Sequence, residues 1–153
     1  MTVRILPTPE ADRAWLHSLM VPYFAELVPH LPAPGPDYND DVWTDAGRHA
    51  LTLLNGAIPM GFALVRDEPS GRRELAEFYI TPDHRRQGLG VQAVDLTLRH
   101  FPGSWILGVA AGSASAAPFW DHCLPSLPSV RQLRKGPPLT PYQSHSFTFR
   151  VSP

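Results

Sequence analysis

The segment Arg85-Arg86-Gln87-Gly88-Leu89-Gly90 joins a β-like stretch, Glu74 to Ile80, to a helix-like stretch, Val91 to His100. Glycines at 88 and 90 carry no side chain, so a ligand can approach the backbone and consecutive N–H groups can turn toward one anion. The helix that follows adds the positive end of its dipole. The pattern is therefore typical of a loop that binds a pyrophosphate. The hexapeptide alone is not specific for such a loop, because this spacing of residues also arises by chance. The interpretation therefore depends on the sequence around it.

The composition limits the partners that the chain can have. At 153 residues it has the size of one domain, and we expect a single domain over residues 1–153. Because 13 basic and 14 acidic side chains nearly cancel, no bulk field would recruit nucleic acid or a membrane surface, and we expect neither partner. The apolar run at Val3, Ile5 and Leu6 is too short for a signal peptide, and Cys123 is the only cysteine. We therefore expect a cytoplasmic protein.

Prolines divide the first third of the chain. Thr8-Pro9-Glu10 is typical of a helix start, and this helix should run to about Val21, with its apolar face formed by Ala11, Trp15 and Leu19 and with Leu16 as a further candidate. A short second helix is expected over Tyr23 to Val28. Four prolines between Val28 and Asn39 indicate a surface loop. An interdomain linker is the alternative, but too little chain precedes it to form a domain.

The remaining sequence predicts strands and two more helices. Asn55-Gly56 favours a tight hairpin between two strands, and Glu74 to Ile80 returns as a third. After the helix from Val91 a buried strand should lie parallel to the strand before that helix. A further helix and a closing hairpin complete the order ααβββαβαββ, an α/β (α+β) fold. The ranges are Ala50 to Leu54, Gly61 to Val65, Trp105 to Val109, Gly112 to about Leu124, Val130 to Lys135 and Ser144 to Val151.

This order, with an arginine- and glycine-bearing loop at its central crossover, resembles the GNAT superfamily of acetyl-CoA-dependent N-acetyltransferases. The signature loop of that family is matched by Arg85, Gly88 and Gly90. A second family pattern is matched by a set at the expected spacing: Ser113, Ala116, Phe119 and Trp120. The stretches Glu77 to Ile80 and Phe101 to Gly103 are similar to a small bacterial branch of predicted acetyltransferases. The resemblance implies a mixed, mostly antiparallel central sheet that splays apart between two parallel strands, with helices on its flanks.

The resemblance also implies which residues would bind acetyl-CoA (coenzyme A). Backbone groups of the third strand, at Phe78, Tyr79 and Ile80, would bind the pantetheine. The pyrophosphate would bind backbone amides of the loop, and an arginine side chain could add a charge; the residues concerned are Arg85, Arg86, Gln87, Gly88, Leu89, Gly90 and Val91. Ser113, Phe119 and Trp120 would line the thioester end. For the two aromatic residues, ordinary packing between helix and sheet is an equally good interpretation.

Glu77 is the candidate general base. Acetyl transfer needs a neutral amine, and partial burial beside the cofactor cleft would raise the affinity of Glu77 for a proton toward a useful range. Strand alternation places Leu75, Glu77 and Tyr79 on one face and Ala76, Phe78 and Ile80 on the other. A purely structural role, pairing Glu77 with a neighbouring arginine, is the alternative.

The general acid is harder to assign. Many members of the family have a tyrosine on the later helix, but this chain has Phe119-Trp120-Asp121-His122 there. Tyr79 is the candidate acid, and Tyr38, Tyr142 or water are alternatives. Ser113 stands where the family usually has asparagine. The predicted function is therefore transfer of an acetyl group to a primary amine of a small molecule or peptide by direct attack in a ternary complex. A noncatalytic acyl-CoA-binding or sensing module is the alternative, and a homodimer is left open.

Other chemistries find little support in the sequence. The seven histidines form no helical pair at metal spacing, so we predict no metal site. Gly88-Leu89-Gly90-Val91-Gln92-Ala93 formally fits a dinucleotide-binding pattern. However, seven residues separate Ile80 from Gly88, and no acidic residue follows the next strand to bind a ribose. The lysine of a nucleoside-triphosphate loop is also missing.

Overall fold

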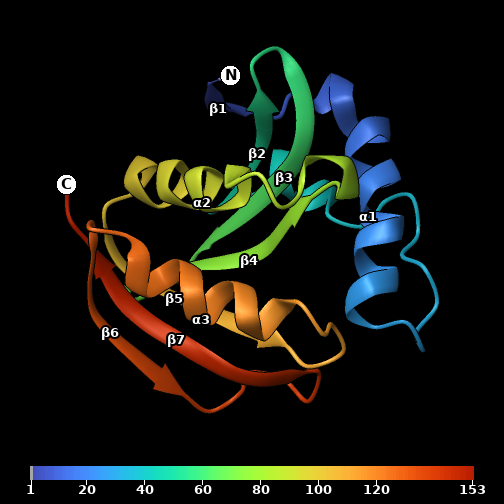
Figure 1. Ribbon diagram of the computed structural model, residues 1–153. Coiled ribbons are helices and arrows are strands. Elements are labelled where there is room, and N and C mark those ends of the chain that lie inside the picture. Colours follow the sequence, from blue (N-terminus) through green and yellow to red (C-terminus); the bar gives the residue numbers. More distant parts are fainter. Residues whose placement is uncertain (1) are drawn as a thin grey trace.

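The computed structural model describes residues 2–153 as one seven-stranded sheet with three α-helices (Figure 1). The strands are β1 (Val3–Pro7), β2 (Arg48–Asn55), β3 (Ile58–Asp67), β4 (Arg73–Ile80), β5 (Gly103–Ala110), β6 (Val130–Gly136) and β7 (Gln143–Val151). The helices are α1 (Arg13–Leu27), α2 (Leu89–His100) and α3 (Ala116–Ser126), with short 3-10 turns at η1 (Glu10–Asp12), η2 (Asp40–Trp43) and η3 (Pro82–His84). None of the helices in this described part is long and apolar enough to cross a bilayer.

The sheet confirms the predicted fold class and corrects the predicted element order. Its strands lie in the order β1-β2-β3-β4-β5-β7-β6, and every neighbouring pair is antiparallel except β4 with β5. The observed order along the chain begins with a strand and one α-helix, where two helices were expected. The stretch Val3–Pro7, which looked only like a short apolar run, pairs with β2 along its whole length. Such a strand at the edge of the sheet carries little signal of its own, because its partner lies far away in the sequence.

Helix α1 continues through Pro22, where the sequence predicted a break. Proline removes one backbone hydrogen bond from a helix interior, at a cost of roughly 3 kcal/mol. The burial of Leu16, Met20 and Tyr23 against Phe62 of the sheet offsets this cost, because these side chains lie on both sides of the proline. The predicted apolar face was only partly right. Leu16 is buried against the sheet, Trp15 and Leu19 pack at the margin of this cluster, and Ala11 is exposed.

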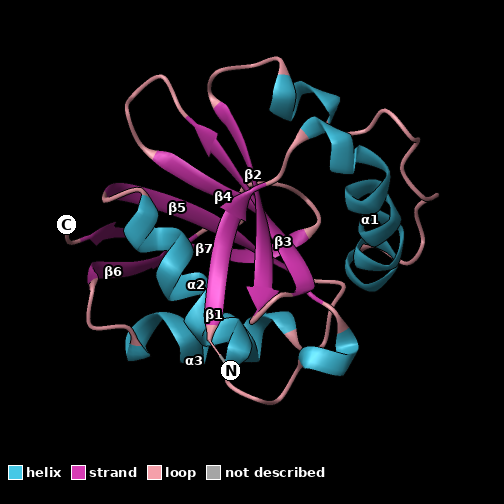
Figure 2. Cartoon of the chain, turned by 90° about the horizontal axis from the view of Figure 1, so that it is seen from above, coloured by secondary structure: helices cyan, strands magenta, loops and turns pink. Residues whose placement is uncertain are grey.

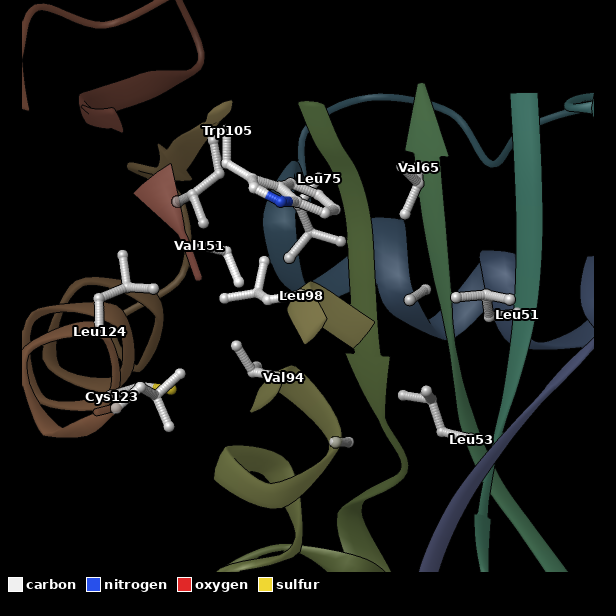
Figure 3. Packing of buried hydrophobic residues seen from close by; sticks show 14 of the residues in the cluster. Leu51, Leu53, Val65, Leu75, Val94, Leu98, Trp105, Cys123, Leu124 and Val151 are labelled. Atoms are coloured by element: carbon white, nitrogen blue, oxygen red, sulfur yellow. The ribbon is translucent and has the colours of Figure 1, made fainter. Parts of the chain in front are cut away.

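The two faces of the sheet are covered by different helices. Figure 2 shows α1 on one side and α2 with α3 on the other. The larger hydrophobic cluster lies under α2 and α3, where Leu98 and Trp105 are almost completely buried. Figure 3 shows Leu75 pointing into this cluster together with these two side chains. A second, smaller cluster lies under α1. The sheet is therefore a wall between two cores, and residues on opposite faces of one strand enter different environments.

Strands β4 and β5 splay apart, as the resemblance implied. Their pairing is limited to Arg73 with Trp105 and Glu74 with Ile106, although each strand has 8 residues. In Figure 1 the two strands meet at one end and diverge toward the end where α1 lies. Beyond Glu74 the edge of β4 that faces β5 is therefore left without a neighbouring strand. This opening is where a ligand can reach the backbone of β4.

A β-bulge changes the faces of β4. Opposite β3, Leu64 pairs with Glu77 and Val65 pairs with Leu75, so Ala76 is an extra residue in β4. The bulge reverses the alternation of side chains. The predicted grouping of Leu75 with Glu77 and Tyr79 is therefore wrong: Leu75 joins the cluster under α2 and α3, while Tyr79 lies in the cluster under α1.

Candidate active site

A cleft of about 900 Å³ passes through the opening between β4 and β5. One part of its wall is formed by the loop before α2, the first turn of α2 and the start of α3. The other part is formed by the end of α1, the proline-rich loop after it and the connection between β6 and β7. The residues of β4 from Leu75 to Ile80 line the cleft between these two parts. All of the residues predicted to bind the cofactor line this cleft except two: Gln87, whose side chain donates to the carbonyl of Asp83, and Leu89, which is buried in the main core.

The loop before α2 presents a row of backbone donors. Within residues 2–153, none of the N–H groups from Arg86 to Val91 donates to a protein acceptor. Arg86 and Gly88 both have positive φ, 61° and 74°, and such left-handed positions let successive N–H groups form a concave anion-binding nest. A Cβ added at Gly88 would meet no atom within 4 Å, so glycine is needed there for its conformation and not for space.

The two arginines of the loop have different roles in the structure. Arg85 donates to the carbonyl of Ile80 at 2.8 Å and forms an ion pair with Glu26 of α1 at 2.9 Å. Its guanidinium also lies 5.4 Å from the centre of the Tyr79 ring. Arg85 therefore ties the loop to both β4 and α1. Arg86 is exposed, forms no ion pair among the described residues, and is the better candidate for a phosphate contact.

The edge of β4 toward the opening has free backbone groups. The N–H of Thr81 donates to Met60 of β3, and backbone direction alternates along a strand. Phe78 and Ile80 therefore direct their backbone groups away from β3 and into the opening. Arg85 takes up the carbonyl of Ile80. The N–H and carbonyl of Phe78 and the N–H of Ile80 remain as the polar edge that a ligand amide could pair with.

Aromatic side chains close the side of the cleft at α3. The rings of Phe78 and Phe119 stack with centres 6.2 Å apart, and Trp120 packs edge-on against both. A Cβ at Gly90 would lie 3.1 Å from the Phe119 ring, so Gly90 lets α3 pack closely on the first turn of α2. Ser113 also lines the cleft, and its hydroxyl lies 3.2 Å from that of Ser115. Phe78, Phe119 and Trp120 therefore both pack against one another and line the cleft.

Glu77 lies in the cleft on the face that α1 covers. Burial is the main cause that raises its pKa from 4.5 to about 7. A hydrogen bond from Tyr23 and the charge of Arg48 lower this pKa, whereas the nearby charge of Glu74 raises it. A carboxyl group with a pKa of about 7 is partly ionised at neutral pH. It can therefore accept a proton there and release it again, which is what a general base must do.

Four tyrosines line the cleft around Glu77. Tyr79 is 4% exposed, and burial raises its pKa, so its phenol stays protonated at neutral pH. Tyr38 and Tyr142 lie at the mouth. Tyr23, which the sequence did not single out, contacts Glu77 through its hydroxyl, and burial raises the pKa of this phenol as well. The expected break at Pro22 concealed its position on α1.

The acidic residues Asp37, Asp40 and Asp41 do not line the cleft. Asp40 forms an ion pair with Arg13 at 2.6 Å, and Asp41 forms one with Arg48 at 3.2 Å. The negative charge of these two residues is therefore compensated close to their own loop.

Residues 12–123 match the acetyltransferase (GNAT) family. The chain belongs to this family. The match covers most of the chain, including the loop before α2 and the splayed strands, and it confirms the predicted family and enzyme class. No curated protein matches the chain.

Solved structures share the GNAT fold with this chain at low sequence identity. An acetyltransferase from Thermus thermophilus has a TM-score of 0.73 and 19% identity, over 97% of this chain and 96% of that one. A spermidine N-acetyltransferase from Vibrio cholerae, in complex with CoA and spermine, has a TM-score of 0.71 and 12% identity, over 97% and 95%. An N-acetyltransferase from Thermoplasma acidophilum, in complex with coenzyme A, has a TM-score of 0.68 and 9% identity, over 99% and 100%.

Proposed function

We propose that this GNAT protein transfers the acetyl group of acetyl-CoA to a primary amine, by direct attack of the amine while both substrates are bound. The observation that carries the proposal is the coincidence, in one cleft, of a row of free backbone donors and a carboxyl group with a pKa of about 7. Structures of similar fold contain CoA, which supports the choice of cofactor.

The residues of the cleft fit coenzyme A. The amides from Arg86 to Val91 form a concave row at the positive end of α2, which suits a diphosphate. The exposed Arg86 would add a positive charge. The free edge of Phe78 offers backbone hydrogen bonds to an extended chain that carries amides. When bound, the cofactor supplies an activated acetyl group as a thioester.

Glu77 is the proposed general base. An alkylamine is protonated at neutral pH and has no lone pair for attack until a base removes one proton. The carboxylate of Glu77 takes this proton at its side-chain oxygen, directly or through water. Burial raises the pKa of Glu77 to about 7, which is close to the value that a general base needs at neutral pH. Tyr79, whose phenol oxygen keeps its proton, is the proposed donor of that proton to the sulfur of the departing coenzyme A, which would leave as the amine forms its bond to the acetyl carbon.

The sensing alternative predicts binding without turnover. The missing tyrosine on α3 and Ser113 favoured it in the sequence, but family membership and Glu77 favour transfer. The test is release of free CoA from acetyl-CoA in the presence of an amine. Glu77→Gln should lower kcat at least about 100-fold, the usual contribution of a general base, while the Kd for acetyl-CoA changes little.

Glu68→Gln is the matched control. Glu68 lies outside the cleft in the turn after β3, where it pairs with Arg72 at 2.6 Å. This variant should retain wild-type turnover. Tight binding of acetyl-CoA without CoA release from any amine would refute the transferase proposal and support the sensing module.

A further inference from the structure

The acceptor part of the cleft is the portion on the α1 side of β4, the side on which Glu77 meets Tyr23. The inference that follows rests on the proposed function, because it concerns the amine that this part would bind. Its walls come from the second half of α1, the proline-rich loop after it and residues 140–143. The carbonyl of Leu27 lies directly against Gly112 of the β5–α3 connection, so the end of α1 closes the cleft on this side.

The walls of the acceptor part are largely apolar. Phe24 packs edge-on against Tyr38, with ring centres 5.4 Å apart. The loop adds aliphatic side chains, and the opposite wall adds another ring; these residues are Leu27, Val28, Leu31, Pro32, Pro34 and Tyr142. At the mouth, Leu31, Tyr38 and Tyr142 are 41%, 45% and 48% exposed. Large apolar side chains grouped at the mouth of a cleft mark a surface that a ligand can cover.

The carboxyl groups that line the cleft can pair with one additional cation. Glu26 is neutralised by its ion pair with Arg85. Glu77 forms no ion pair among residues 2–153, so it is the one carboxyl group of the described lining without an ion-pair partner. A second ammonium group in the acceptor would have to lie against the apolar walls without a partner. Burying an unpaired charge there is costly.

We propose that the acceptor is a small primary amine with an apolar, preferably aromatic, body and no second positive charge. Its amine would meet Glu77 and its body would lie against Phe24, Leu31 and Tyr38. A polyamine fits these walls poorly, because its additional ammonium groups find no free carboxylate. The acceptor thus differs in chemical class from the spermine that is bound to the Vibrio cholerae enzyme of similar fold.

The test compares 2-phenylethylamine, ethylamine and spermidine as acceptors for the full chain with acetyl-CoA. The first two share the reacting group and differ in the apolar body. We expect kcat/KM for 2-phenylethylamine to exceed the values for the other two amines by about tenfold or more, since one well-placed methylene group alone is worth about tenfold. Equal values for 2-phenylethylamine and ethylamine, or a higher value for spermidine, would overturn the inference and leave the proposed function intact.

A pair of leucine variants tests where the apolar body lies. Leu31→Ser should raise KM for 2-phenylethylamine about fivefold and reduce the preference for it over ethylamine. Leu6→Ser, which replaces a leucine of β1 that is 48% exposed and outside the cleft, should leave the preference unchanged. An equal effect of Leu31→Ser on both amines would refute the proposed contact. If none of the three amines is acetylated although acetyl-CoA binds, the proposed function fails together with the inference.

Discussion

The raised pKa of Glu77 should make the stability of the protein depend on pH in a specific way. The carboxyl group binds its proton more tightly in the folded chain, at a pKa of about 7 against the ordinary 4.5. Its contribution to stability is therefore fully present below about pH 4.5 and is lost as the pH rises through about 7. Glu77→Gln removes this contribution, because glutamine does not titrate.

The expected size follows from the two pKa values. Between about pH 5 and about pH 8.5 the wild-type chain should lose about 2.5 kcal/mol of unfolding free energy relative to the Gln variant. Urea denaturation of both proteins at both pH values measures this, and the comparison isolates Glu77 because all other titrating groups are shared. Acid conditions should favour the wild type, and alkaline conditions should favour the variant.

Glu68→Gln is again the control. Its hydrogen bond to Arg72 lowers the pKa of Glu68, so its contribution is lost only as the pH falls through values below 4.5. The difference between this variant and the wild type should therefore be the same at about pH 5 and about pH 8.5. If the Glu77→Gln difference is also independent of pH, Glu77 titrates as an ordinary carboxyl group. Glu77 would then be unsuited to act as a general base at neutral pH.

Substitution of two neighbours of Glu77 should shift the rising limb of the kcat/KM profile against pH in opposite directions. Tyr23→Phe should shift it to higher pH, because a hydrogen bond that lowers the pKa of Glu77 is lost. Glu74→Gln should shift it to lower pH, because a negative charge that raises this pKa is lost. Shifts in the same direction would contradict this arrangement. Gly88→Ala should weaken acetyl-CoA binding in calorimetry by roughly 1–2 kcal/mol through strain at positive φ, with an unchanged circular dichroism spectrum. Leu98→Ala should reduce the unfolding free energy by about 2–5 kcal/mol in urea, since this side chain is completely buried; a loss under about 1 kcal/mol would show that α2 is not part of the main core.

Local patterns predicted much of the fold. The hairpin at Asn55-Gly56 and the crossover through α2 follow from turn residues and apolar periodicity, and the structure contains both. The first strand escaped prediction because its stability comes from pairing with a distant segment. The continuation of α1 through Pro22 escaped it for a similar reason: burial on the sheet outweighs a local penalty, and burial cannot be seen in the helix sequence alone.

The site was predicted in its backbone part better than in its side chains. The glycines of the loop impose a conformation directly, so the row of free amides from Arg86 to Val91 could be expected. The partners of charged groups depend on segments far apart in the chain. Nothing in the sequence therefore indicated that Arg85 would pair with Glu26 or that Tyr23 would contact Glu77.

The extra residue in β4 gives one strand two separate tasks. Up to Leu75 the strand pairs with β5 and contributes to the core under α2 and α3, and after Ala76 it lines the cleft. In a strand without the bulge, strict alternation would place Glu77 on the same face as Leu75, toward the apolar core under α2. A single extra alanine therefore separates the part of β4 that pairs with β5 from the part that carries Glu77 into the cleft.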